Sequence, residues 1–208
     1  AQHRSGHRVS TWDMLKRSGN RLLAVQYVLH TACVSSITYL FPLWVGDELG
    51  WGAREVGIVF GFQGAIMVVL QGIVLGPVAT WLGEWRFLRT AIGFMLLGLS
   101  LAVFASGMPW MVASVIIAMS GATLCMPLLN AITSHRTPQE FRGRMLGTTA
   151  SAASWGRVVG PLLAGANLAR FGYSAAWLGC VVIVLVYLVW ALRAGRGNTA
   201  AIDQPGMV

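Results

Sequence analysis

The stretch Tyr173–Leu192, YSAAWLGCVVIVLVYLVWAL, contains no charged side chain. A helix needs about 20 apolar residues in a row to cross the hydrocarbon core of a bilayer, and this stretch has that length. A membrane β-strand would alternate apolar and polar residues, and no such alternation is present. We therefore predict a membrane-spanning helix here.

Five further stretches are apolar over a comparable length. They are Leu22–Val45, Val56–Trp81, Leu88–Ser106, Trp110–Ser134 and Leu146–Arg170. Lipid offers no hydrogen-bond partner to a free backbone group, so each of them must be a helix. The prediction is an all-α, polytopic membrane protein. A six-helix transmembrane bundle fills residues 21–193, between a cytoplasmic linker (1–20) and a cytoplasmic C-terminal tail (194–208).

Composition excludes most other classes. Charged residues make up 11% of the chain, whereas a soluble domain carries about 25%. The net charge of +8 does not indicate nucleic-acid binding, because the charges are scattered through short gaps between apolar runs. Cys33, Cys125 and Cys180 lie in three separate runs, which predicts buried small side chains and neither a disulfide nor a metal site. No cofactor is expected.

The basic residues fall mostly on one side of the membrane. Of the 15 Lys and Arg residues, all except Arg54, Arg157 and Arg170 flank the spans on the side that holds both termini. Basic residues accumulate on the cytoplasmic side of membrane proteins. We therefore predict a multi-pass protein of the plasma (inner) membrane with both termini in the cytoplasm.

Small residues line up on two of the predicted helices. Span two has a stripe of Gly57, Gly61, Gly64 and Gly72, and span five has one face of Gly143, Gly147, Ala150 and Ser154 and another of Gly156 and Gly160. Glycine lets helix backbones approach closely in membranes. Close helix packing is sufficient to explain these faces. The more specific alternative is an interface along which the helices slide or rock.

Prolines inside the spans predict bends. Pro42, Pro77, Pro127 and Pro161 each remove a backbone donor. Each thereby frees the carbonyl group four residues earlier, at Thr38, Ile73, Thr123 and Arg157 respectively. Such carbonyls need partners from neighbouring groups. Bent helices around a cavity are common in transporters and occur in receptors too.

Two segments carry a family resemblance. One runs from Gln63-Gly64 through Gln71-Gly72 to Gly76-Pro77-Val78-Ala79-Thr80-Trp81-Leu82-Gly83-Glu84-Trp85-Arg86. It resembles the eighth helix and following loop of major facilitator superfamily transporters, where the loop reads Gly-x-x-x-Asp-Arg-x-Gly-Arg-Arg. The other combines Pro127-Leu128-Leu129-Asn130-Ala131, Thr137–Arg144 and Gly156-Arg157-Val158-Val159-Gly160-Pro161. It resembles helices ten and eleven of the tetracycline and multidrug proton antiporters in that superfamily.

The resemblance implies that the chain is the C-terminal six-helix half of a twelve-helix transporter. Its partners would then be the lipid bilayer, an N-terminal six-helix half missing from this chain, a small-molecule substrate and protons. Substrate would bind between the halves near the midplane, and efflux by proton antiport would proceed through alternating access. Thr80 and Trp81 replace the aspartate and arginine of the loop motif. Gly76, Gly83 and Arg86 are expected to be its structural remnants, with a gating role.

Polar residues within the spans are the candidate site. Arg157 is the one charge predicted near mid-membrane, and leaving it buried without a partner would cost several kcal/mol. It is either a structural clamp, a substrate or coupling residue, or a group nearer the interface than its position suggests. Its partner is Asn130, a freed carbonyl or a carboxylate of the other half. The remaining cavity or coupling candidates are Asn130, Gln71, Gln63, Gln26 and His30.

Two further expectations concern function. No acidic residue lies in the middle of a span, so a coupling carboxylate would come from the missing half. Apolar residues available to the cavity, which favour drug-like or amphiphilic substrates, are Phe41, Phe60, Phe62, Met67, Met119 and Met126. The alternative is a non-transporting six-helix protein that serves as an assembly partner or receptor. An enzyme is not expected, since no nucleophile motif or cluster of His, Asp and Glu is present.

Overall fold

The computed structural model describes residues 18–202, and their side chains over residues 21–193. The helices are α2 (Ser18–Leu49), α3 (Ala53–Val69), the π-helix η1 (Leu70–Val74), α4 (Leu75–Leu82), α5 (Glu84–Val103), α6 (Met108–Arg136) and α7 (Gln139–Ile202). The predicted linker lies outside the described residues up to residue 17, and its last three residues already belong to α2. The predicted tail is helical as far as Ile202.

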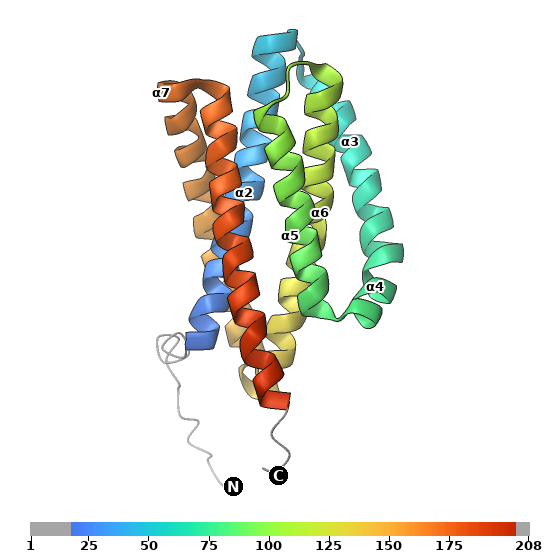
Figure 1. Ribbon diagram of the computed structural model, residues 1–208, viewed down its shortest axis with the longest axis vertical. Coiled ribbons are helices and arrows are strands. Elements are labelled where there is room, and N and C mark those ends of the chain that lie inside the picture. The colour runs from blue at the N-terminus through green and yellow to red at the C-terminus, as the bar shows by residue number, and fades with distance from the viewer. Residues whose placement is uncertain (1–17, 203–208) are drawn as a thin grey trace, which may run out of the picture.

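The described helices are long and apolar enough to cross a membrane. Four candidate spans cover Arg21–Leu49, Ala53–Leu82, Glu84–Val103 and Met108–Arg136, and a fifth, Gln139–Arg193, has 55 residues. This last helix changes direction at Gly172, whose φ of 80° and ψ of −176° only glycine adopts readily. Figure 1 shows α7 folding back at the end of the bundle opposite the start of α2. The predicted all-α, polytopic membrane fold is confirmed.

One predicted boundary is wrong. The span predicted over Leu88–Ser106 ends as a helix at Val103, because the chain tightens there into a three-residue turn. The Phe104 amide donates to the Leu101 carbonyl at 3.2 Å, and the Ala105 amide donates to the Ala102 carbonyl at 3.3 Å. The other helices reach beyond the predicted spans, since a helix does not have to end where the hydrocarbon core ends.

Close backbone contacts join α5 to α6 and α2 to α7. A Cβ atom at Gly98 would overlap the backbone of Ala118, and one at Gly121 would overlap the carbonyl oxygen of Ala91. Between α2 and α7, a Cβ atom at Gly156 would overlap the Thr31 hydroxyl, and one at Gly160 the Ala32 carbonyl oxygen. Glycine at these positions allows the helix axes to approach each other.

The glycine stripe of α3 and η1 does not make the predicted close contact within the described residues. Among these residues, no atom lies within 4 Å of a Cβ placed at Gly57, Gly61 or Gly64 in α3 or at Gly72 in η1. Gln63 is the buried residue of α3, while Ile58, Phe62 and Val68 are exposed. Within the described residues this helix therefore has an uncovered face, because α3 stands at the edge of the bundle (Figure 1).

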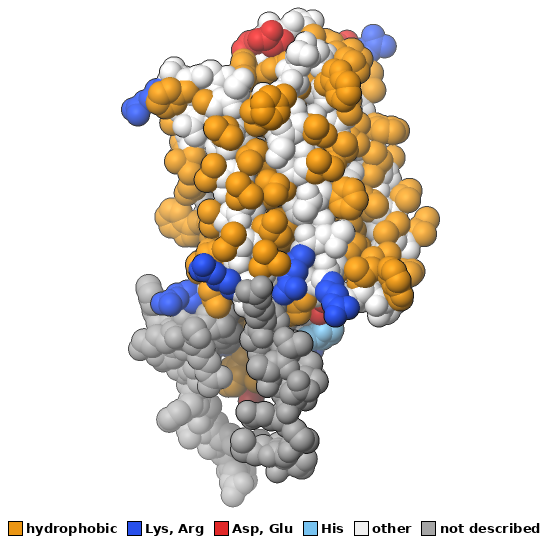
Figure 2. Space-filling model, in the orientation of Figure 1, with side chains coloured by type: hydrophobic (Ala, Val, Ile, Leu, Met, Phe, Trp, Pro, Cys, Tyr) orange, Lys and Arg blue, Asp and Glu red, His pale blue; other side chains and the backbone are white. Residues whose placement is uncertain are grey.

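The surface divides into an apolar band and a basic belt. In Figure 2, hydrophobic side chains cover the length of the bundle, and Arg side chains gather at the end where α2 begins and α7 ends. Asp47, Glu48 and Arg54 lie at the opposite end, where α2 meets α3. This is the separation that a protein crossing a bilayer requires.

Candidate functional site

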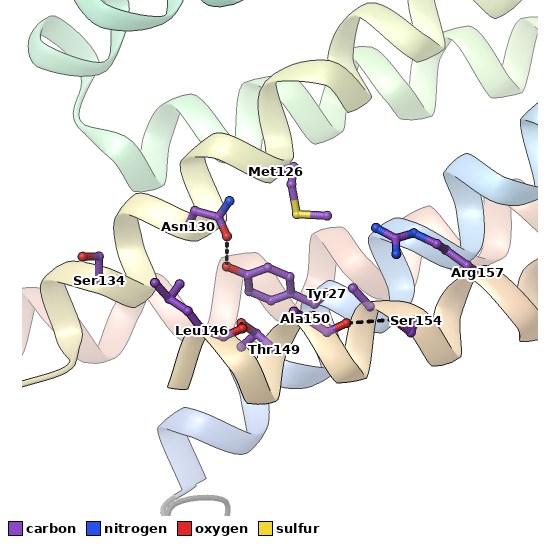
Figure 3. Close-up of a pocket in the computed structure, with 10 residues that line it drawn as sticks. Tyr27, Met126, Asn130, Ser134, Leu146, Thr149, Ala150, Ser154 and Arg157 are labelled. Carbon is purple, nitrogen blue, oxygen red and sulfur yellow. Dashed lines mark hydrogen bonds between the residues drawn. The ribbon is translucent and has the colours of Figure 1, made fainter. Parts of the chain in front are cut away.

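A cavity of about 640 Å³ opens between α2, α6 and the first arm of α7, which we define as residues 139–171. Figure 3 shows its lining. The lining residues are Tyr27, Met126, Asn130, Ser134, Leu146, Thr149, Ala150, Ala153, Ser154 and Arg157. Hydroxyl and amide groups therefore share the wall with small and apolar side chains, and Arg157 is its charged member.

Tyr27 fixes the orientation of Asn130. The Tyr27 hydroxyl donates to Asn130 Oδ1 at 2.7 Å (Figure 3). The same hydroxyl lies 3.3 Å from the Thr133 hydroxyl. Since Asn130 Oδ1 accepts this bond, the amide nitrogen of Asn130 is turned away from Tyr27. Tyr27 itself is 2% exposed, so the ring is held in the core while the hydroxyl reaches the wall of the cavity.

Arg157 lies about midway along the first arm and extends its guanidinium into the open space beside Met126 (Figure 3). It is exposed within this chain. Gly156 and Gly160, on the neighbouring face of the same helix, hold it against α2. Among the hydrogen bonds and ion pairs of residues 21–193, none involves the Arg157 guanidinium, so Asn130 lines the same cavity but is not its partner.

Three of the predicted polar candidates lie in the interior and do not line this cavity. Gln26 is 0% exposed, His30 4% and Gln63 6%. The His30 ring lies against Tyr187, with 6.0 Å between ring centroids, in the second arm of α7, which we define as residues 173–202. The helices that carry these residues are apolar on all sides, so the sequence did not show which face each polar group occupies.

Gln71 does not line the cavity either, and instead serves a proline bend. Its amide nitrogen donates to the Thr123 carbonyl oxygen at 3.1 Å. That carbonyl is the group left free by Pro127, which interrupts the hydrogen bonding of α6. Gln71 lies in η1, where π-helical geometry locally changes the direction of side chains. Gln71 on one helix thus donates a hydrogen bond to the carbonyl group that a proline leaves free in another helix.

This pairing predicts a specific non-additivity. Gln71→Leu should lower the free energy of unfolding by about 1 kcal/mol, because it leaves the Thr123 carbonyl without a partner. In a Pro127→Ala background the residue 127 amide can bond to that carbonyl, so the same Gln71→Leu change should cost close to nothing. A double-mutant cycle in detergent–lipid micelles measures both values. An equal cost of Gln71→Leu in both backgrounds would show that the two residues are independent.

The remaining candidates lie at the α4–α5 turn and along α7. Gly83 joins α4 to α5 with a φ of 80°, whereas Gly76 and Gly143 have no atom within 4 Å of an added Cβ. Arg86 is exposed in the first turn of α5, and Pro161 is half-buried in α7. Gly143, which was predicted to lie on a packing face, thus makes no helix contact within the described residues. The gating roles of these residues stay predictions.

A polar contact at the same turn was not foreseen. Glu84 stands where the loop motif has an arginine, and it pairs with His135 at the end of α6 at 3.1 Å. The neighbouring Arg136 guanidinium lies 4.8 Å from the centre of the Trp85 ring. These contacts tie the α4–α5 turn to α6 although Thr80 and Trp81 have replaced the charged motif residues.

Sequence reasoning missed most of the cavity wall. Tyr27, Ser134 and Thr149 were not predicted, because a lone aromatic or hydroxyl residue in an apolar run usually packs or bonds its own helix. Ser154 was seen as part of a small face, and its hydroxyl does bond the Ala150 carbonyl at 3.1 Å. Of the six apolar residues predicted for the cavity, Met126 lines it, while Phe41 is buried in the core and Phe62 and Met67 are exposed on α3.

The chain is similar to known proteins over most of its length. A family model described as Major Facilitator Superfamily matches residues 23–205. The class G tetracycline resistance protein of Vibrio anguillarum is 30% identical over 152 residues, which cover 71% of this chain and 38% of that protein. The multidrug resistance protein MdtH of Edwardsiella ictaluri is 28% identical over 187 residues, which cover 88% of this chain and 46% of that protein.

A solved structure shares the fold. The human organic anion transporter MFSD10 aligns with a TM-score of 0.76 at 19% identity, over 84% of this chain and 41% of that chain. The chain therefore spans less than half the length of these relatives. The predicted resemblance to the tetracycline and multidrug resistance proteins is confirmed. Because the family model matches almost the whole chain, the chain belongs to the Major Facilitator Superfamily.

Proposed function

We propose that this chain is the C-terminal half of a secondary transporter that exports drug-like or amphiphilic small molecules by proton antiport. The observation that carries the proposal is the open cavity between α2, α6 and the first arm of α7, with Arg157 about midway along that arm. A second six-helix half would close this cavity from the other side and place substrate between the two. The tetracycline and multidrug resistance proteins among its relatives support export as the direction of transport.

The way this half is held together supports alternating access as the mechanism. α2 and the first arm of α7 meet through Gly156 and Gly160, and α5 meets α6 through Gly98 and Gly121. Such contacts make the half a stiff body, so rocking against the second half is the motion that opens either side. The uncovered glycine face of α3 is a surface where the second half would slide or dock.

Proton coupling would be completed outside this chain. The acidic residues of the described part, Asp47, Glu48, Glu55, Glu84 and Glu140, all lie at helix ends. A carboxylate that takes up and releases a proton inside the membrane would therefore come from the second half. We place the protein in the plasma (inner) membrane with the basic belt in the cytoplasm, as the distribution of Lys and Arg favours.

The test uses the full-length protein that contains this chain, in everted membrane vesicles. After energisation, vesicles should accumulate tetracycline or an amphiphilic dye, and an ionophore that collapses the proton gradient should release it. Vesicles with an empty vector serve as the control. If a broad panel of amphiphiles showed no gradient-dependent accumulation, a non-transporting six-helix assembly partner or receptor would become the better reading.

A further inference from the structure

The cavity holds a cation with no anion to balance it. Arg157 is the charged residue of the lining, and none of the other lining side chains is a carboxylate. The acidic residues of the described chain belong to the last turn of α2 or the first turns of α3, α5 and α7. All of them are thus far along the helix axes from the middle of the first arm.

This imbalance has an energetic consequence. A guanidinium near the middle of a bilayer is costly unless it meets water or an anion. Its planar set of donors matches the two oxygens of a carboxylate better than any neutral acceptor. The cavity exposes these donors, since the side chain of Arg157 extends into it (Figure 3).

A second donor is available on the facing helix. Because Tyr27 donates to Asn130 Oδ1, the Asn130 amide nitrogen is free to donate, and Figure 3 shows it turned away from Tyr27. Asn130 comes from α6 and Arg157 from α7, on two sides of the same cavity. The core position of Tyr27, 2% exposed, keeps this amide oriented before any ligand arrives.

We propose that Arg157 binds the carboxylate of an anionic amphiphile in this cavity, with the Asn130 amide as a second donor to the same molecule, so that the transported molecules include organic acids. This proposal rests on the proposed function and further specifies that the substrate carries a negative charge. A carboxylate of the second half could offer Arg157 the same chemistry. The experiment below separates the two sources.

Binding is measured with the full-length protein in lipid nanodiscs. The probes are 4-(1-pyrenyl)butyrate and its neutral counterpart 1-pyrenebutanol, followed by energy transfer from tryptophan to pyrene, with empty nanodiscs as the background. The unmodified protein should bind the butyrate about tenfold to a hundredfold more tightly than the alcohol, the range expected for a charge-assisted hydrogen bond. Arg157→Gln should abolish that preference and leave the affinity for the alcohol unchanged.

Two further variants sharpen the result. Asn130→Asp should weaken butyrate binding, because it replaces a donor with a negative charge, and should spare the alcohol. Arg170→Gln, at the outer end of the same arm, is the matched control and should change neither affinity. Equal binding of the two probes, or a butyrate preference that survives Arg157→Gln, would overturn the anion site.

The same binding measurements show whether the carboxylate beside Arg157 belongs to the ligand or to the second half of the protein. If Arg157 paired with a carboxylate of the protein, Arg157→Gln would shift the affinities for both probes alike, and this outcome also counts against the proposal. Failure of the proposed function looks different. A butyrate preference that depends on Arg157, in a protein without proton-driven export, would keep the anion site and remove the antiport.

Discussion

Gly160→Ala is expected to lower the free energy of unfolding by about 3 kcal/mol, at the upper end of the range for overpacking. The added methyl group would overlap the backbone carbonyl of Ala32 in α2. Backbone cannot move aside as a flexible side chain can, so α2 and α7 would have to separate. The gain in helix propensity from replacing glycine, at most about 1 kcal/mol, does not offset this. Steric trapping of the full-length protein in bicelles measures the change.

Gly147→Ala on the same arm is the matched control. It has open space around the added atom, so it should keep or slightly raise stability. Equal effects of the two substitutions would mean that the α2–α7 contact does not depend on the absence of a side chain at residue 160.

Arg157→Ala is expected to reduce proton-driven export by about tenfold to a hundredfold, because it removes a charge-assisted contact in the cavity. The side chain is exposed and packs little within this half, so membrane insertion and stability should be unchanged. Export of a gradient-dependent substrate from everted vesicles measures the effect, normalised to the amount of inserted protein.

Arg157→Lys separates charge from shape in the same assay. It keeps the positive charge but not the planar fork of donors, so it should restore part of the activity. Arg170→Ala serves as the control and should export normally. Normal export by Arg157→Ala itself would remove this residue from the transport mechanism and leave a role in helix packing or none.

The sequence could predict that these apolar runs are membrane-spanning helices because this depends only on their length. Tyr173–Leu192 and its five counterparts are long enough that no soluble alternative competes. The ends of helices were less certain. Leu101 and Ala102 accept bonds that end α5 early, and nothing in the apolar composition of that segment predicts this turn.

The rotation of each helix could not be read from the sequence. A helix that is apolar on all sides has no hydrophobic face to show which way its polar residues point. Hence Gln26 and His30 were expected to line a cavity but are buried between α2 and its neighbours, while Tyr27, between them in sequence, reaches the wall. Asn130 was one of the partners expected for Arg157, and the two line one cavity without a hydrogen bond between them in the described residues.

The turn at Gly172 has a consequence for how forces pass through this half. A single residue joins the two arms of α7, so there is no loop to absorb a shift of one arm relative to the other. The first arm carries Arg157 and packs closely against α2 at Gly156 and Gly160. If a molecule bound to the guanidinium displaces the first arm, α2 and the second arm therefore have to move with it as one rigid unit.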